Sequence, residues 1–226
     1  FGPKGTQLMA KAIALRIKKT SFFSGEEEIE VYYGKGRLRQ TVSFVEQAWV
    51  LFKEDRAGDA LQLLEKNLRP IQLLADGYFL LGQIYDKIGE TEKSIITFRL
   101  LVRLNPERAL AYNLLGAALV KAKNFEDALS ALNRAAEISP DYPDAYFNLA
   151  MAFEGLNQGK EALGNLLLAE RLYIKKGNQK MYDFARYMAS KWEDRFRLDA
   201  TKLNNRLPTA ETLSNLSNIG MLRRRL

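Results

Sequence analysis

The sequence predicts an all-α fold: a right-handed superhelical array of helix–turn–helix repeats, an α-solenoid, closed by a C-terminal capping helix. Three observations predict it. One motif recurs every 34 residues, apolar residues between its copies follow the spacing of amphipathic helices, and two prolines end repeating units. Units of this length are helical hairpins that bury their apolar faces only by stacking on one another.

The recurring motif places an aromatic, a large apolar and a small residue on one face of each unit's first helix. Its three copies are Tyr78, Leu81 and Gly82; Tyr112, Leu115 and Gly116; and Tyr146, Leu149 and Ala150. The second helix carries a small residue and then a large apolar one, at Ser94 and Phe98, Ala128 and Leu132, and Ala162 and Leu166. Small side chains on both helices allow a close approach. We therefore expect Gly116 to lie opposite Ala128, with the other units built alike.

Pro106 and Pro140 close two of the units, because proline cannot continue a helix. With these prolines the pattern resembles the tetratricopeptide repeat family over residues 75–174. A weaker copy runs from 41 to 74, where Gln47 replaces an apolar residue and the proline comes early, at Pro70. The resemblance implies that this chain is a non-enzymatic binding protein. It also implies that the first helix of each repeat lines a concave ligand-binding surface.

The chain is expected to have four parts. They are a basic N-terminal segment at 1–40, four repeats at 41–176, a capping helix at 177–200 and a basic tail at 201–226. The repeats are expected at 41–74, 75–108, 109–142 and 143–176. In the capping helix, Met181, Ala185, Met188 and Trp192 share one face, and such an amphipathic helix typically covers the open end of an array.

The N-terminal segment is apolar as well as basic, and its sequence fits two structures. Ser24 and Glu27 form a capping box typical of a helix start, whereas Ile29, Val31 and Tyr33 alternate with polar residues as in a strand. Because the segment has no core of its own, we expect it to dock on the array as a cap or as a ligand mimic.

The residue types that support most side-chain catalysis and metal binding are missing. The chain has no cysteine and no histidine, which excludes disulfides, thiolate and nearly all zinc sites, and Ser–His or Cys–His catalysis. The stretch from Gly155 to Lys160 faintly resembles a phosphate-binding loop, but it lacks the required spacing and the following Ser or Thr. We predict no catalytic residue, no metal site and no cofactor, and therefore no enzyme.

The expected binding groove is the stripe of each first helix that faces away from its hairpin partner. Counted from the start of a repeat, places 2, 5, 9 and 12 form that stripe. The groove residues predicted in this way are Val42, Val45, Trp49, Phe52, Phe79, Gln83, Leu110, Asn113, Ala117, Phe147 and Met151. Most of them are apolar, and an exposed apolar patch normally marks a binding site.

The sequence therefore predicts a scaffold or assembly factor that holds an apolar or amphipathic segment, helical or extended, of another protein, within a multi-subunit complex. Two alternatives follow from the charge, because both ends of the chain are basic and the formal net charge is +7. The C-terminal helix and tail could bind RNA, or the N-terminal helix a membrane surface. No apolar run reaches the roughly 18 residues of a membrane span, so we expect a soluble, cytoplasmic protein.

Overall fold

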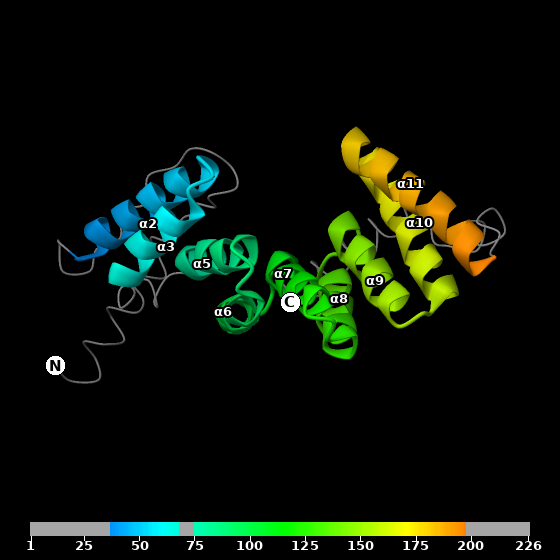
Figure 1. Cartoon of the computed structure of the whole chain (residues 1–226), viewed down its shortest axis with the longest axis horizontal. Coiled ribbons are helices and arrows are strands. Elements are labelled where there is room, and N and C mark those ends of the chain that lie inside the picture. Colours follow the sequence, from blue (N-terminus) through cyan, green and yellow to red (C-terminus); the bar gives the residue numbers. More distant parts are fainter. Residues whose placement is uncertain (1–36, 68–74, 198–226) are drawn as a thin grey trace, which may run out of the picture. The chain divides into compact units, whose positions relative to one another are not determined.

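The structure is a computed structural model that describes residues 37–67 and 75–197, with side chains from residue 44 onward (Figure 1). Every regular element within these ranges is an α-helix. The chain divides into two compact units, residues 1–88 and 89–226, and each unit is described by itself. The predictions for the N-terminal segment up to residue 36, for Pro70 and for the basic tail lie outside the described residues.

The first unit contains three described helices, α2 (Arg37–Lys53), α3 (Ala57–Lys66) and α5 (Ala75–Lys87). Helices α2 and α3 form a hairpin, and α5 packs against both. Their shared core consists of Val45, Ala48, Ala57, Ala60, Leu64, Leu80, Leu81 and Ile84. The alanines at the α2–α3 contact are fully or almost fully buried, so the two helices approach closely despite the weak motif in this unit.

The second unit contains six described helices that pack in chain order. They are α6 (Thr91–Leu104), α7 (Ala109–Lys121), α8 (Phe125–Ile138), α9 (Pro143–Gly155), α10 (Gly159–Lys175) and α11 (Gln179–Phe196). Each contacts the next, and α7 also contacts α9, so the first helices of successive hairpins lie side by side. This is the packing of a helical solenoid.

Two glycines in the second unit, Gly116 and Gly155, lie where another side chain fills the space of a missing Cβ. A Cβ on Gly116 would lie 2.4 Å from Leu132 Cγ. The side chain that covers this glycine is therefore Leu132, one turn after the predicted partner Ala128, which is itself buried. A Cβ on Gly155 would lie 2.3 Å from the Phe125 ring. Both glycines let a helix approach a bulky neighbour.

The turns inside the hairpins share one backbone conformation. Asp55, Gly89, Lys123 and Asn157 all have a positive φ, between 58° and 85°, and they are 34 residues apart. After three of them a backbone N–H reaches back across the turn, for example from Asn124 to the Leu119 carbonyl at 2.9 Å. This bond is typical of a helix end closed by a left-handed residue. From residue 55 onward, the backbone conformation of the turns therefore repeats with the same 34-residue period as the sequence.

Helix α11 is the predicted capping helix. It begins with the Asn178 side chain accepting a hydrogen bond from the Met181 N–H, at 3.2 Å. It buries Ala185, Ala189 and Trp192. Its last residue, Phe196, covers Gly159 so closely that a Cβ there would lie 2.3 Å from the ring. Packing by Phe196 therefore accounts for the second glycine of the stretch that resembled a phosphate-binding loop.

Candidate protein-binding surface

In the first unit, α2 and α5 bring the predicted groove residues into one aromatic cluster. Trp49 stacks on Phe52 with ring centroids 5.8 Å apart and lies 6.1 Å from Phe79. Trp49, Phe52 and Gln83 are half-buried. Val45 and Phe79, expected on the open surface, are instead only 3% and 4% exposed. Side chains between two packed first helices are buried by the neighbouring repeat, which the count within one repeat did not include.

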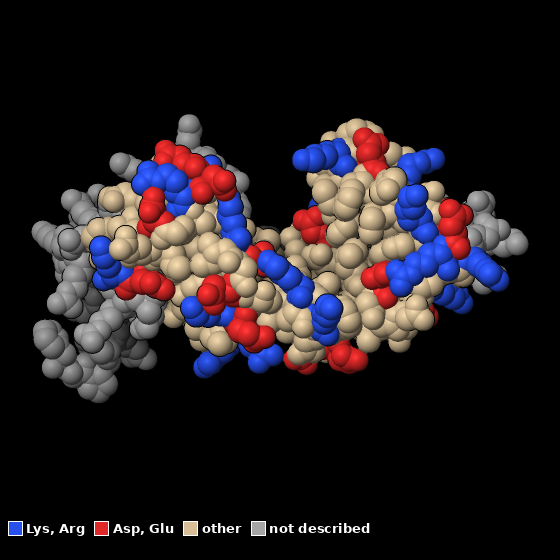
Figure 2. Space-filling view, in the orientation of Figure 1, with Lys and Arg blue, Asp and Glu red and all other residues tan. Residues whose placement is uncertain are grey.

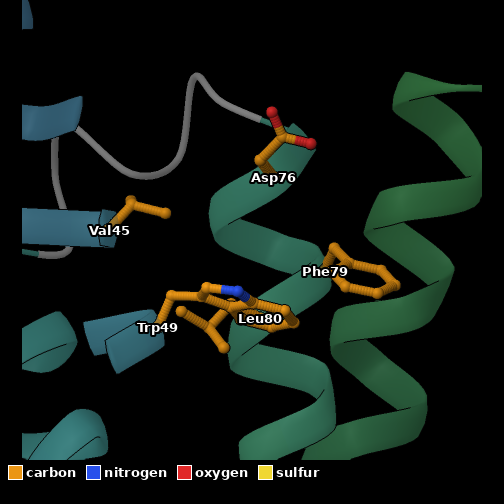
Figure 3. Close-up of a pocket in the computed structure, with 5 residues that line it drawn as sticks. All are labelled: Val45, Trp49, Asp76, Phe79 and Leu80. Atoms are coloured by element: carbon orange, nitrogen blue, oxygen red, sulfur yellow. The ribbon is translucent and has the colours of Figure 1, made fainter. Parts of the chain in front are cut away.

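A small cavity lies between these two helices (Figure 3). It is lined by Val45, Trp49, Asp76, Phe79 and Leu80. Figure 3 shows the Trp49 indole beside Leu80, with Asp76 at the start of α5. The centre of a water molecule can occupy about 10 Å³ of it, room for one water at most. The cavity is therefore a packing defect and too small for a ligand.

Basic side chains border the accessible part of this cluster. The Lys53 ammonium lies 5.6 Å from the Trp49 ring centroid, and the Lys87 ammonium lies 5.1 Å from that of Phe52. Lys87 also pairs with Asp55, and its hydrogen bond and charge lower the pKa of that exposed carboxyl. The predicted groove residue Val42 is in α2, but its side chain is outside the described residues.

In the second unit, α7 and α9 carry the remaining predicted groove residues. Leu110, Ala117, Phe147 and Met151 are half-buried, and Asn113 is only 6% exposed. Asn113 belongs to a hydrogen-bonded chain between the helices. The Asn148 amide donates to Asn113 Oδ1 at 2.9 Å, and Asn113 Nδ2 in turn donates to the Tyr142 hydroxyl at 3.3 Å. Two carboxamides thus lie together at the junction of two first helices.

Two tyrosines extend this polar chain toward α10. The Tyr173 hydroxyl donates to Asp144 Oδ1 at 2.5 Å. Burial and, secondly, the Asp144 carboxylate raise the pKa values of Tyr142 and Tyr173 far above their ordinary range. Both hydroxyls are protonated at neutral pH, as tyrosine hydroxyls ordinarily are, and can donate hydrogen bonds. The network holds the first turn of α9 against α10, because its members come from both helices.

Helix α11 adds residues to this surface that the sequence analysis missed. Phe184 lies 5.8 Å from Phe147, ring centroid to ring centroid, and is 47% exposed. Arg195 forms an ion pair with Glu154 at the end of α9. The helical spacing of the sequence could have indicated that Phe184 is exposed. Phe184 lies outside the face formed by Met181, Ala185 and Trp192, so it cannot be fully buried with them.

Other kinds of site are not found in the described part of the chain. No group of three or more Asp and Glu side chains there is arranged to hold a metal ion. No described helix has both the length and the apolar run that crossing a bilayer requires. The predictions that the chain has no cofactor and no catalytic residue stay predictions.

Comparison with known families gives the repeat its name. A sequence model of the tetratricopeptide repeat matches residues 75–108, and a second model, described as TPR repeat, matches residues 118–157. The chain therefore contains tetratricopeptide repeats. A solved structure of MamA from Desulfovibrio magneticus RS-1 superposes with a TM-score of 0.54 over 71% of this chain and 97% of MamA. Their sequence identity is 17%, so this likeness concerns the tetratricopeptide fold alone.

Two curated relatives are similar to parts of this chain. The peroxisomal targeting signal receptor of Saccharomyces cerevisiae is 32% identical over 103 residues, which are 46% of this chain and 17% of the receptor. The mouse protein O-mannosyl-transferase TMTC3 is 32% identical over 81 residues, which are 36% of this chain and 9% of the transferase. The chain thus matches about a sixth or less of each. Together with the tetratricopeptide matches, these similarities support a role in protein–protein interaction.

Proposed function

We propose that this chain is a non-enzymatic scaffold or assembly factor that binds an apolar or amphipathic segment of another protein, as part of a larger complex. One observation carries the proposal. Large apolar side chains of the first helices, among them Trp49, Phe52, Phe147 and Met151, remain partly exposed after the hairpins have packed. Apolar and aromatic side chains in this state are the usual anchors of protein interfaces.

The proposed binding residues fall into two sets. Trp49, Phe52 and Gln83 belong to the first unit; Leu110, Ala117, Phe147 and Met151 belong to the second. The predicted residues Val45, Phe79 and Asn113 are buried; they support these sets from beneath and are not proposed as contacts. Completing the burial of a half-exposed Phe or Met contributes about 1 kcal/mol, so several anchors together give a useful affinity.

The paired carboxamides suit a bound polypeptide. A segment in contact with a protein surface must satisfy its main-chain N–H and C=O groups. Asn148 donates one hydrogen bond to Asn113, and its carboxamide oxygen has no protein partner among the described residues. That oxygen can accept from a main-chain N–H, while the neighbouring Phe147 and Met151 contact the segment's side chains.

The relatives support this proposal over an enzymatic role. A receptor for a targeting signal recognises a segment of another protein, and the yeast receptor shares 103 aligned residues with this chain. The similarity to the O-mannosyl-transferase is confined to 9% of that enzyme. The parts of each relative that resemble this chain therefore support a role in recognition rather than either protein's whole activity.

Selection from a random-peptide display library against the full chain tests the proposal. Parallel selections would use Met151→Glu and, as a control, Ile96→Glu, which alters an apolar side chain that is 60% exposed on a second helix. We expect enriched peptides with recurring apolar residues, whose binding falls at least tenfold with Met151→Glu and is unchanged with Ile96→Glu. No enrichment, or equal loss in both variants of intact helicity, would refute the proposed surface.

A further inference from the structure

The exposed side of α11 carries aromatic rings and both signs of charge along one stripe. Phe184 is 47% exposed and Tyr187 is 59% exposed. Since an α-helix turns by about 100° per residue, these two rings and four exposed charged side chains lie within about 100° of one another around the helix axis. We call these six residues the α11 stripe: Lys180, Asp183, Phe184, Tyr187, Lys191 and Asp194.

The α11 stripe faces away from the helix on which α11 packs. The buried residues of α11 are Ala185, Ala189 and Trp192, and they lie on the opposite side of the helix. At the edge of the stripe, Phe184 touches Phe147 of α9. Another helix can therefore pack along the stripe without displacing α9 or α10.

The charges of the α11 stripe alternate in sign along the helix. In chain order they are Lys180, Asp183, Lys191 and Asp194. No ion pair in the described part of the chain involves any of the four. Asp183 accepts a hydrogen bond from the Gln179 amide at 2.9 Å, and the Lys191 ammonium lies 5.7 Å from the Tyr187 ring centroid. All four charges are exposed and can pair with a partner.

We propose that the α11 stripe binds the same stripe of a second copy of this chain, with the two helices antiparallel about a two-fold axis at Tyr187. Such an axis places each residue opposite the one equally far beyond Tyr187 in the other copy. Lys180 and Asp194 are both seven residues from Tyr187, and Asp183 and Lys191 are both four. Each lysine therefore meets an aspartate of the other copy, and the two Tyr187 rings meet at the axis.

The rings and the charges have different roles in this dimer. Phe184 faces Ser190 of the second copy, an exposed small residue that leaves room for the ring. Burial of the rings provides the affinity, whereas exposed ion pairs add little to it but disfavour wrong arrangements. Parallel helices would pair like charges, and a register shifted by three residues would place Lys180 against Lys191. One helix from each copy makes a small interface, so we expect a weak dimer.

Other occupants match the α11 stripe less well. An acidic helix would meet Asp183 and Asp194, and a basic helix would meet Lys180 and Lys191. Figure 2 shows acidic side chains beside the basic ones along α11, where a nucleic-acid site would present one sign of charge. Residues 198–226 hold five basic and two acidic residues, an excess that does not match a stripe with two charges of each sign. The interface contains no residue of the proposed groove, so it does not rest on the proposed function.

Sedimentation equilibrium of the full chain at low salt tests the dimer. We expect a monomer–dimer equilibrium with a Kd of about 1–100 µM. Lys180→Glu with Lys191→Glu leaves four carboxylates on the stripe and should weaken the dimer at least tenfold. Adding Asp183→Lys and Asp194→Lys reverses all four charges and should restore the dimer, which damage to the fold would not. As a control, Lys123→Glu with Lys160→Glu makes the first charge change on other exposed lysines and should leave the Kd unchanged.

A single cysteine tests the position of the two-fold axis. The chain has no cysteine, so Tyr187→Cys introduces its one thiol. Two packed helices that face each other at position 187 hold its Cα atoms about 4–6 Å apart, which suits a disulfide. We expect Tyr187→Cys to form a disulfide-linked dimer in a glutathione redox buffer. Ile96→Cys, at a position on α6 that is 60% exposed, should not.

Four outcomes would overturn the proposed dimer. They are a chain that stays monomeric up to about 1 mM, a dimer that the two glutamate substitutions leave intact, no recovery when all four charges are reversed in a chain of intact helicity, and equal disulfide formation at positions 187 and 96. A dimer that forms only after removal of residues 198–226 would identify the chain's own C-terminal segment as the occupant, and would overturn it too. Each of these results leaves the proposed function standing, because peptide selection there depends on Met151.

Discussion

At the scale of single residues, the hairpin turns depend on a backbone conformation that most residues disfavour. A left-handed conformation costs a residue with a Cβ about 1 kcal/mol, whereas glycine adopts it freely. Of the four equivalent turn residues, only Gly89 avoids this cost; Asp55, Lys123 and Asn157 do not. The sequence period locates these turns, but a lysine at position 123 gives no sign of a positive φ.

Exchanging glycine and a side chain at these turns should change stability in opposite directions. Lys123→Gly should raise the free energy of unfolding by about 0.5–1 kcal/mol, because it removes the backbone strain. Gly89→Ala should lower it by about 1 kcal/mol through strain alone, since no atom lies within 4 Å of the added Cβ. Urea unfolding followed by circular dichroism measures both. Changes of the same sign would contradict the strain argument.

Small residues in the hairpins show what the sequence could predict at this scale. Helical spacing identified Gly116 as a point of close approach, and the structure confirms that a side chain covers it. The spacing suggested Ala128 as its partner, whereas Leu132 fills the space. Both residues are on the same face of α8, and the axial offset between two helices decides which one makes the contact. That offset depends on the packing of all the side chains between the helices.

At the scale of helices, polar contacts fix α9 to α10. Tyr173 of α10 donates to Asp144 of α9. The Tyr146 hydroxyl donates to the Pro140 carbonyl at 3.0 Å and fixes α9 to the turn that precedes it. Burial, and then the charge of Asp141, raise the pKa of Tyr146 to about 12. The repeat motif predicted the apolar contacts between α9 and α10 but not the Tyr173–Asp144 bond, whose partners are 29 residues apart in the sequence.

Removing one hydroxyl should show what the network contributes. Tyr173→Phe leaves the Asp144 carboxylate without its buried donor and should lower the free energy of unfolding by about 1–3 kcal/mol. Tyr187→Phe makes the same chemical change on a ring that is 59% exposed and should have an effect below about 0.5 kcal/mol. Urea unfolding compares the two variants. Equal effects would show that the hydrogen bond to Asp144 contributes nothing specific.

The Asp141–Lys176 ion pair predicts a dependence on pH. Burial raises the pKa of Asp141, but hydrogen bonds from Lys176 and Ser139 outweigh it, so the pKa is lowered in the folded protein. A lowered carboxyl pKa stabilises the fold above the unfolded value of about 3.9, and this contribution disappears as pH falls through the folded value. Lys176→Gln should therefore destabilise the chain at pH 7 by up to about 1 kcal/mol. The difference from the parent should shrink as pH falls through the lowered pKa of Asp141; a difference that does not change with pH in this acidic range would contradict the ion-pair account.

At the scale of the whole chain, the period of 34 residues predicted an all-α repeat fold, and the spacing of apolar residues after it predicted the capping helix. The candidate surface was harder to predict. Counting within one repeat identified side chains that face away from their own hairpin, but not those that the next repeat buries, which is why Val45 and Phe79 are in the core. The count also ended at the last repeat and so missed Phe184 on α11.

Site-specific photo-crosslinking in cells that express the chain tests most directly whether the half-exposed apolar surface binds another protein. A photoreactive phenylalanine analogue would replace Met151 or, as the control, the exposed Ile96 on a second helix. The account predicts that position 151 crosslinks to a defined segment of another polypeptide and that position 96 does not. Crosslinks from position 151 only to this chain itself, or the same products from both positions, would contradict it.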